Sequence, residues 1–152
     1  KKFSDYSLKE IEHVLGVNLL GAVYLSQQFG RLLMKRKIKG SIVNMSSVSG
    51  QEGSSDAMYG ISKAGLIGLT KSCAMNFAPF VRVNALAPGV VDTAMLGMIP
   101  KWRLKEYRKA ELIDEPILPE DIANSVWFLL SNEGSHYTGT VLDINNGCYL
   151  RS

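Results

Sequence analysis

A tyrosine and a lysine four positions apart, Tyr59 and Lys63, are the residues of this chain whose types and spacing most directly suggest chemistry. In a helix this spacing places both side chains on one face, one turn apart. A fixed ammonium close to a phenol favours the phenolate, which lowers the phenol pKa from about 10 and allows proton exchange nearer neutrality. Ser47 lies upstream, where the apolar stretch 40–45 ends in hydroxyls. Hydroxyl, phenol and ammonium together suit proton transfer to or from a carbonyl or an alcohol.

The composition is that of an ordinary globular protein. A chain of 152 residues forms one domain at most and is long enough to bury a core. The net charge of +3 is too small to favour nucleic acid, and the basic run 35–39 contains no aromatic residue. Cys73 and Cys148 lack the spacing of a metal or redox motif, so two free thiols and a cytoplasmic location are expected. No apolar run reaches the length of a membrane span, and the charged residues 1–5 do not resemble a signal peptide.

Helical and strand periodicities alternate along the chain. Strands are predicted at 42–45, 81–86 and 140–144. A first helix, capped by Ser4 or Ser7, is predicted to run to about Lys37, and a second from Ala57 to Phe77. Residues 94–112 are predicted to be irregularly helical, and 119–130 to form an amphipathic helix that begins with proline. Strands separated by helices predict an α/β fold with a parallel sheet.

In their order, these motifs resemble the short-chain dehydrogenase/reductase family. The matching segments are 17–21 (VNLLG), 46–50 (SSVSG), the Tyr-x-x-x-Lys at 59–63, 83–89 (VNALAPG) with the later Thr93, and 137–139 (YTG). The resemblance runs from about Ser4 to the end of the chain. It implies a Rossmann-like, doubly wound parallel sheet and an NAD(P)-dependent oxidoreductase acting on a carbonyl or secondary alcohol.

The motif that opens such domains is not found in this sequence. Family members begin with a strand and a glycine-rich turn that binds the cofactor pyrophosphate at a helix N-terminus. Neither G-x-x-x-G-x-G nor Asn-Asn-Ala-Gly occurs here. The resemblance therefore predicts that residues 1–152 are the C-terminal part of a single domain, with three adjacent strands and an unpaired edge.

The resemblance also implies catalytic roles. Tyr59 would be the general acid in reduction and the general base in oxidation, and Lys63 would lower the phenol pKa and bind the nicotinamide ribose. Ser47 would hold the substrate oxygen; the loop before Tyr59 is shorter than is usual in the family, so Ser46 is the alternative. Asn18 would hold a water that links Lys63 to solvent.

The cofactor-binding residues implied by the resemblance are Tyr59, Lys63, Pro88, Gly89, Val91 and Thr93. The main chain of Val91 would meet the carboxamide, and the Thr93 hydroxyl would contact the carboxamide or the phosphates. The cofactor is expected to be NADP or NAD, with NADP preferred because of the reductase resemblance. No metal is expected.

Among family members the chain looks most like the 3-oxoacyl-carrier-protein reductases, so a carrier-bound substrate is expected beneath a lid formed by residues 94–112. Residues 51–58 and 145–147 differ from those reductases, and a sugar, a polyol or a small secondary alcohol is the alternative substrate. A different alternative is a non-catalytic relative acting as a binding or structural subunit. Such a relative would be expected to lack Tyr59 or Lys63, whereas both are present.

The family's pairing of its two long helices with those of a second copy implies a homotetramer, or otherwise a dimer. Both long helices of this chain carry apolar residues on more than one side, and a surplus apolar face commonly marks a partner. In the second helix these residues are Leu66, Ile67, Leu69, Cys73 and Met75. A charge at Leu69 or Cys73 is predicted to split the assembly.

Overall fold

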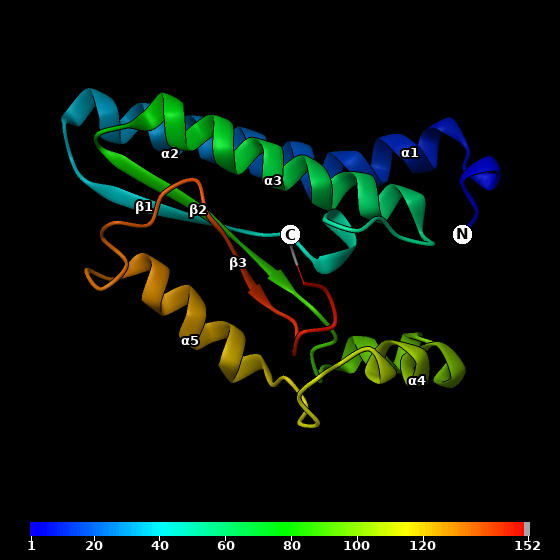
Figure 1. Ribbon diagram of the computed structural model, residues 1–152. Helices are drawn as coiled ribbons and strands as arrows, with labels where there is room; N and C mark the ends of the chain where they lie inside the picture. The colour runs from blue at the N-terminus through cyan, green and yellow to red at the C-terminus, as the bar shows by residue number, and fades with distance from the viewer. Residues whose placement is uncertain (151–152) are drawn as a thin grey trace.

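The computed structural model describes residues 1–150, apart from the side chain of Met98. Three parallel strands form one sheet in the order β1 (Gly40–Met45), β2 (Val81–Pro88) and β3 (Val141–Ile144). Helices lie on both faces of the sheet (Figure 1). The predicted α/β fold with a parallel sheet is therefore confirmed.

The first predicted helix is present but contains an irregular turn. Helix α1 (Leu8–Leu15) begins with a capping box, in which Ser7 Oγ accepts from the Glu10 N–H and the Glu10 carboxylate accepts from the Ser7 N–H. Ser7, rather than Ser4, is thus the cap. A π-helical turn, Gly16–Leu20, follows and leads directly into α2 (Gly21–Arg36). Such turns often occur at functional sites, and this one carries Asn18.

Helix α3 (Ala57–Phe77) has the predicted bounds. It starts where the Asp56 side chain accepts a hydrogen bond from the Tyr59 N–H, and Pro79 follows its end. Its packing corrects the prediction that Leu69 and Cys73 face another subunit. Cys73 belongs to a buried cluster shared by α2, α3 and β2, and Leu69 packs against that cluster. Cys73 is buried and Leu69 is partly buried because α3 packs against both the sheet and α2.

Helix α5 (Pro119–Leu130) covers the opposite face of the sheet (Figure 1). The Arg82 guanidinium, from β2, donates to the carbonyls of Leu129 and Gly134, both at 2.7 Å, and to that of Ser131 at 3.1 Å. The segment predicted as irregularly helical comprises a 3₁₀ turn (Ala94–Met98) and α4 (Lys101–Lys109). It lies beyond the C-terminal ends of β2 and β3 (Figure 1).

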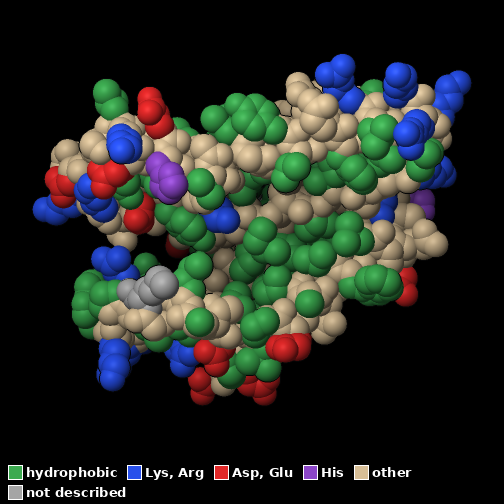
Figure 2. Space-filling model, turned by 180° about the vertical axis from the view of Figure 1, so that it is seen from behind, with side chains coloured by type: hydrophobic (Ala, Val, Ile, Leu, Met, Phe, Trp, Pro, Cys, Tyr) green, Lys and Arg blue, Asp and Glu red, His purple; other side chains and the backbone are tan. Residues whose placement is uncertain are grey.

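Strand β1 is an edge of this sheet within the described residues, as predicted. A groove of about 590 Å³ runs along β1. It is lined by β1, α2 and the α3 residues Lys63 and Leu66. Leu25 and Phe29 of α2 line the groove while 74% and 43% exposed. Figure 2 shows hydrophobic side chains gathered across the middle of the molecule on the face seen from behind.

Candidate active site

The predicted catalytic residues meet at the carboxyl end of β1. This strand ends at Met45 and is followed by Ser46 and Ser47. Helix α3 then returns along the sheet toward the start of β2, so its first turn, which carries Tyr59, lies at the same end. In open α/β sheets this is the end where ligands bind.

Tyr59 and Lys63 are placed as their spacing predicts. The Lys63 Nζ lies 5.5 Å from the centroid of the Tyr59 ring. It also donates a 2.9 Å hydrogen bond to the carbonyl of Met45, which ties the ammonium to the end of β1. Burial lowers the pKa of the Lys63 amine from its ordinary value. A partly desolvated ammonium beside a phenol is well placed to influence proton transfer at that phenol.

The two candidate serines have different environments. Ser46 is 3% exposed, and its hydroxyl donates to the carbonyl of Lys63 at 2.8 Å. Ser47 is half-buried, and its oxygen accepts from the Ser49 N–H at 3.2 Å. A hydroxyl that only accepts keeps its proton for another partner. The Ser46 hydroxyl thus donates to α3, whereas the Ser47 hydroxyl keeps a proton that it can donate.

Asn18 contacts α3, the helix that carries Tyr59 and Lys63, through a residue that was not predicted. Its side-chain amide donates to the Ser62 hydroxyl at 3.1 Å, and that hydroxyl donates to the carbonyl of Tyr59 at 2.8 Å. Ser62 is fully buried. Asn18 and Lys63 also line the same groove along β1. A serine within a helix commonly bonds a carbonyl one turn back, so Ser62 could have been anticipated from its position after Tyr59.

The predicted cofactor segment follows β2 at the same end of the sheet. Pro88 ends the strand, and the Gly89 N–H donates to the carbonyl of Ile144 at 2.9 Å. A Cβ on Gly89 would lie 3.0 Å from Cα of Asn145, so a larger residue here would be tightly packed against the end of β3.

Val91 and Thr93 extend this segment beyond the strand. Val91 forms an isolated parallel bridge with Ile117. Thr93 is exposed, and its side chain makes no capping bond to the 3₁₀ turn that follows. Among the hydrogen bonds of residues 1–150, none joins the segment 88–93 to Tyr59 or Lys63.

Neither a membrane-spanning helix nor a metal-binding cluster is found within the described residues. No helix there is long and apolar enough to cross a membrane. No group of three His, Cys, Asp or Glu side chains that could hold a metal ion occurs there.

Known proteins match this chain over nearly its whole length. A family model described as Enoyl-(Acyl carrier protein) reductase matches residues 1–149. The 3-oxoacyl-[acyl-carrier-protein] reductase of Aquifex aeolicus is 40% identical over 151 residues, which are 98% of this chain and 60% of that protein. The acetoacetyl-CoA reductase of Synechocystis is 42% identical over 135 residues, covering 87% of this chain and 56% of the relative. The chain thus spans little more than half the length of these relatives.

Solved structures agree with the fold. A 4-hydroxyisoleucine dehydrogenase complexed with NADH superposes with a TM-score of 0.90 at 32% identity, covering 97% of this chain and 63% of that one. A 3-oxoacyl-[acyl-carrier protein] reductase from Brucella melitensis superposes with a TM-score of 0.92 at 30% identity, covering 99% and 57%. The sequence motifs, the parallel sheet and the matched family model lead to one conclusion: the chain belongs to the short-chain dehydrogenase/reductase family, and its sheet is part of a Rossmann-like domain.

Proposed function

We propose that the protein is an NAD(P)-dependent oxidoreductase that transfers a hydride between a nicotinamide cofactor and a carbonyl or secondary alcohol. The observation that carries this proposal is the juxtaposition of Tyr59 and Lys63 at the end of β1, with the ammonium 5.5 Å from the phenol ring. A non-catalytic relative would have no need to keep this pair. Relatives named as reductases and as a dehydrogenase support the same reaction class.

Side chains of this chain donate, accept and relay the proton. In reduction, Tyr59 gives its phenolic proton to the substrate oxygen, and in oxidation it takes that proton back. Lys63 stabilises the phenolate electrostatically, and the Ser47 hydroxyl donates a hydrogen bond to the substrate oxygen. Asn18, in the groove beside Lys63, holds a water that reconnects the site to solvent. The bound nicotinamide supplies or accepts the hydride.

The available donors fit the nicotinamide end of such a cofactor. Lys63 carries three N–H donors, and Met45 accepts from one of them, so others can bind ribose hydroxyls. The exposed Thr93 hydroxyl and the main chain at Gly89 and Val91 follow β2 at the same end of the sheet. NADP is preferred over NAD on the reductase resemblance, and one relative was solved with NADH.

The finer features of the whole protein follow from the same relatives. We propose that residues 1–152 are the C-terminal part of one domain whose other part binds the cofactor phosphates and covers the edge of β1. The substrate is a 3-oxoacyl thioester on an acidic carrier protein, in line with the names of the matched reductases. The protein acts in the cytoplasm, consistent with the free thiols of Cys73 and Cys148, and assembles as a homotetramer.

The test is turnover by the full-length protein. Oxidation of NADPH and of NADH is followed with acetoacetyl-CoA and with a 3-oxoacyl carrier-protein thioester. Tyr59→Phe should remove nearly all turnover while the protein stays folded, because only the transferable proton is deleted. Tyr24→Phe, which removes a hydroxyl from an exposed ring on α2, is the matched control and should keep full activity. Retention of most activity in Tyr59→Phe would overturn the assignment, and cofactor binding without any turnover would favour a binding subunit.

A further inference from the structure

The start of the chain contacts the start of α3 at Asp56: the Tyr6 hydroxyl is hydrogen-bonded to this carboxylate, and the main-chain nitrogen of Lys1 lies 3.7 Å from its Oδ2. The Tyr6 hydroxyl donates a 2.6 Å hydrogen bond to Oδ1 of Asp56, fifty positions later in the sequence. The same carboxylate oxygen accepts from the main-chain N–H of Tyr59 at 3.2 Å. One oxygen atom therefore connects Tyr6 with the backbone of the proposed acid/base residue.

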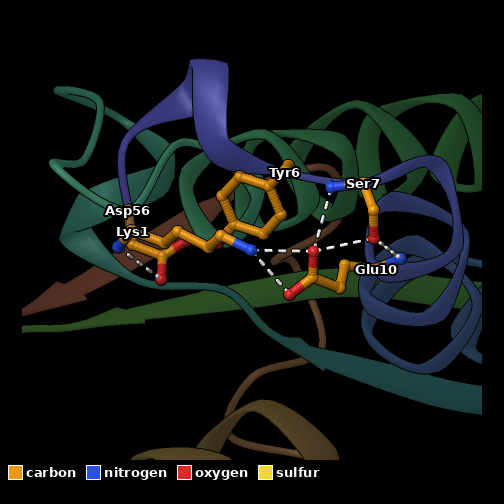
Figure 3. Close-up of polar contacts among 5 residues, drawn as sticks. All are labelled: Lys1, Tyr6, Ser7, Glu10 and Asp56. Atoms are coloured by element: carbon orange, nitrogen blue, oxygen red, sulfur yellow. Dashed lines mark hydrogen bonds and ion pairs between the residues drawn. The ribbon is translucent and has the colours of Figure 1, made fainter.

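Figure 3 shows Tyr6 among the polar contacts of Lys1, Ser7, Glu10 and Asp56. It directly precedes Ser7, whose capping box with Glu10 fixes the start of α1. Lys1 donates to both carboxylate oxygens of Glu10 at 2.7 Å, and its ammonium lies 5.0 Å from the centroid of the Tyr6 ring. Tyr6 thus stands between two capped helix starts, that of α1 and that of α3.

The loop before Tyr59 is bonded to other elements at both ends: Asp56 accepts from Tyr6, and the Gln51 side-chain amide donates to Oδ1 of Asp143 in β3 at 2.7 Å. Residues 50–56 are rich in glycine and serine, and Gly53 adopts the left-handed conformation with φ +95°. Within the loop, the Asp56 N–H donates to the Ser54 hydroxyl at 3.1 Å. The bond from Tyr6 comes instead from a different element of the fold, so it fixes the cap relative to the body of the molecule.

The protonation states of Tyr6 and Asp56 favour a hydrogen bond between them throughout the neutral pH range. Burial acts to raise the pKa of the Asp56 carboxyl, but the hydrogen bonds from Tyr6 and from the Tyr59 main chain, together with the main-chain ammonium of Lys1, outweigh it and hold that pKa below its usual value. The bond to Asp56 raises the pKa of Tyr6 to about 12. A protonated phenol thus faces an ionised carboxylate throughout the neutral range, where charge-assisted bonds are strong.

We propose that Tyr6 is a positioning residue for Tyr59, acting through the Asp56 cap of α3. The inference rests on the proposed function, since it assumes that Tyr59 exchanges a proton with the substrate. The Tyr59 ring projects from the first turn of α3, so a shift of the cap moves the phenol relative to Ser47. Small displacements of a reacting group cost large factors in rate, while cofactor contacts at Lys63 and at residues 88–93 are left in place.

The test uses the full-length protein and separates kcat from KM. Tyr6→Phe should lower kcat about tenfold and leave KM for the cofactor within about twofold, as expected for a mispositioned acid/base group. Asp56→Asn keeps both the cap and an acceptor for Tyr6, so it should retain most of kcat. Asp56→Ala loses both the cap and the acceptor, so its kcat should fall at least as far as that of Tyr6→Phe.

A double variant tests the route of the effect. If Tyr6 acts through Asp56, Tyr6→Phe should cost little further kcat in an Asp56→Ala background. Tyr24→Phe is the matched control for removal of a phenolic hydroxyl.

Two results would overturn the positioning role. One is wild-type kcat in Tyr6→Phe, even if Tm falls, because that outcome describes a purely structural bond. The other is additive losses of kcat in the double variant. Tyr59→Phe, measured alongside, separates the two proposals: if Tyr59→Phe is inactive and Tyr6→Phe is fully active, the proposed function stands and only the positioning role fails.

Discussion

The side-chain amide of Asn18 donates a 3.1 Å hydrogen bond to the Ser62 hydroxyl, which joins the π-helical turn of the first long helix to the helix that carries Tyr59 and Lys63. Ser62 is fully buried and passes the contact on to the carbonyl of Tyr59. The orientation of Asn18 therefore depends on a residue one position before Lys63.

This relationship predicts a shared effect of two substitutions. Ser62→Ala removes the acceptor of the Asn18 amide, so it should lower kcat by a similar factor to Asn18→Ala, and the double variant should fall no further. It should also lower the free energy of unfolding by about 1–2 kcal/mol, because one buried hydrogen bond is lost. Steady-state kinetics and urea unfolding of the full-length variants measure both effects. Independent, additive losses of kcat would show that Ser62 does not orient Asn18.

The two serines after β1 should separate activity from stability. Ser47→Ala removes a half-buried hydroxyl that is free to donate, so it should abolish most turnover with little change in stability. Ser46→Ala removes a buried bond to the carbonyl of Lys63 and should cost about 1–3 kcal/mol of stability while keeping more of the activity. Parallel kinetic and unfolding measurements decide the assignment. The reverse order of activity losses would transfer the substrate contact to Ser46.

Much of this arrangement was predictable from local sequence signals. Helix α3 has the predicted bounds because Asp56 is a strong cap at its start and Pro79 follows its end. The Tyr59–Lys63 geometry follows directly from helical spacing. The order of alternating elements was enough to predict a parallel sheet, because helices between strands allow parallel pairing.

What could not be predicted depends on contacts distant in sequence. Apolar spacing alone does not distinguish a π-helical turn from regular helix, so the turn that carries Asn18 was missed. The bond between Tyr6 and Asp56 spans fifty positions and leaves no periodic signal. The internal placement of Leu69 and Cys73 was missed because a helix packed on two partners has the same pattern as one with an exposed apolar face.

The pKa of Lys63 predicts a pH effect on stability. Burial lowers the pKa of this amine below its usual 10.5, so the folded protein loses the proton before the unfolded chain does. Between the folded pKa and 10.5 the unfolded chain holds more protons, and the stability therefore rises with pH across that alkaline range. At lower pH the penalty for burying the charge is fully present.

Replacing Lys63 should remove the contribution of its amine to the dependence of the free energy of unfolding on pH. In Lys63→Met, the free energy of unfolding should rise less steeply as the pH approaches about 10.5 than it does in the wild type. Lys9→Met, at an exposed position on α1, is the control and should keep the wild-type slope. Urea unfolding at a series of alkaline pH values measures it. An unchanged slope in Lys63→Met would mean that burial of this amine does not affect its titration.

Arg82 should be important for the stability of α5. Its guanidinium donates to carbonyls at and just beyond the C-terminal end of α5, where cations also suit the helix dipole. Arg82→Met should lower the free energy of unfolding by about 2–4 kcal/mol, because several carbonyls lose their donor. Arg82→Lys should keep only part of this stabilisation, since an ammonium cannot reproduce the planar, forked set of N–H donors of a guanidinium. Arg31→Met, at an exposed position on α2, should change stability by less than about 0.5 kcal/mol.

The proposed tetramer can be tested at a position that distinguishes an interface from the core. Ile61, Gly68 and Met75 are exposed along one side of α3, and a Cβ built on Gly68 meets no atom within 4 Å. In an isolated subunit Gly68→Ala should therefore stabilise the helix by about 0.5–1 kcal/mol. If α3 packs against a second copy on this side, Gly68→Glu should instead split the assembly while each subunit stays folded.

The comparison with Leu69 makes this prediction specific. Leu69→Glu places a charge against the buried cluster around Cys73, so it should unfold the protein rather than dissociate it. Light scattering measures the molar mass, and circular dichroism reports whether the subunits stay folded. A wild-type protein that is monomeric at micromolar concentration would contradict the tetramer. A Gly68→Glu variant that keeps the full assembled mass would also contradict the tetramer. A carboxylate without a partner cannot lie between two packed helices, so this side of α3 would then not be an interface.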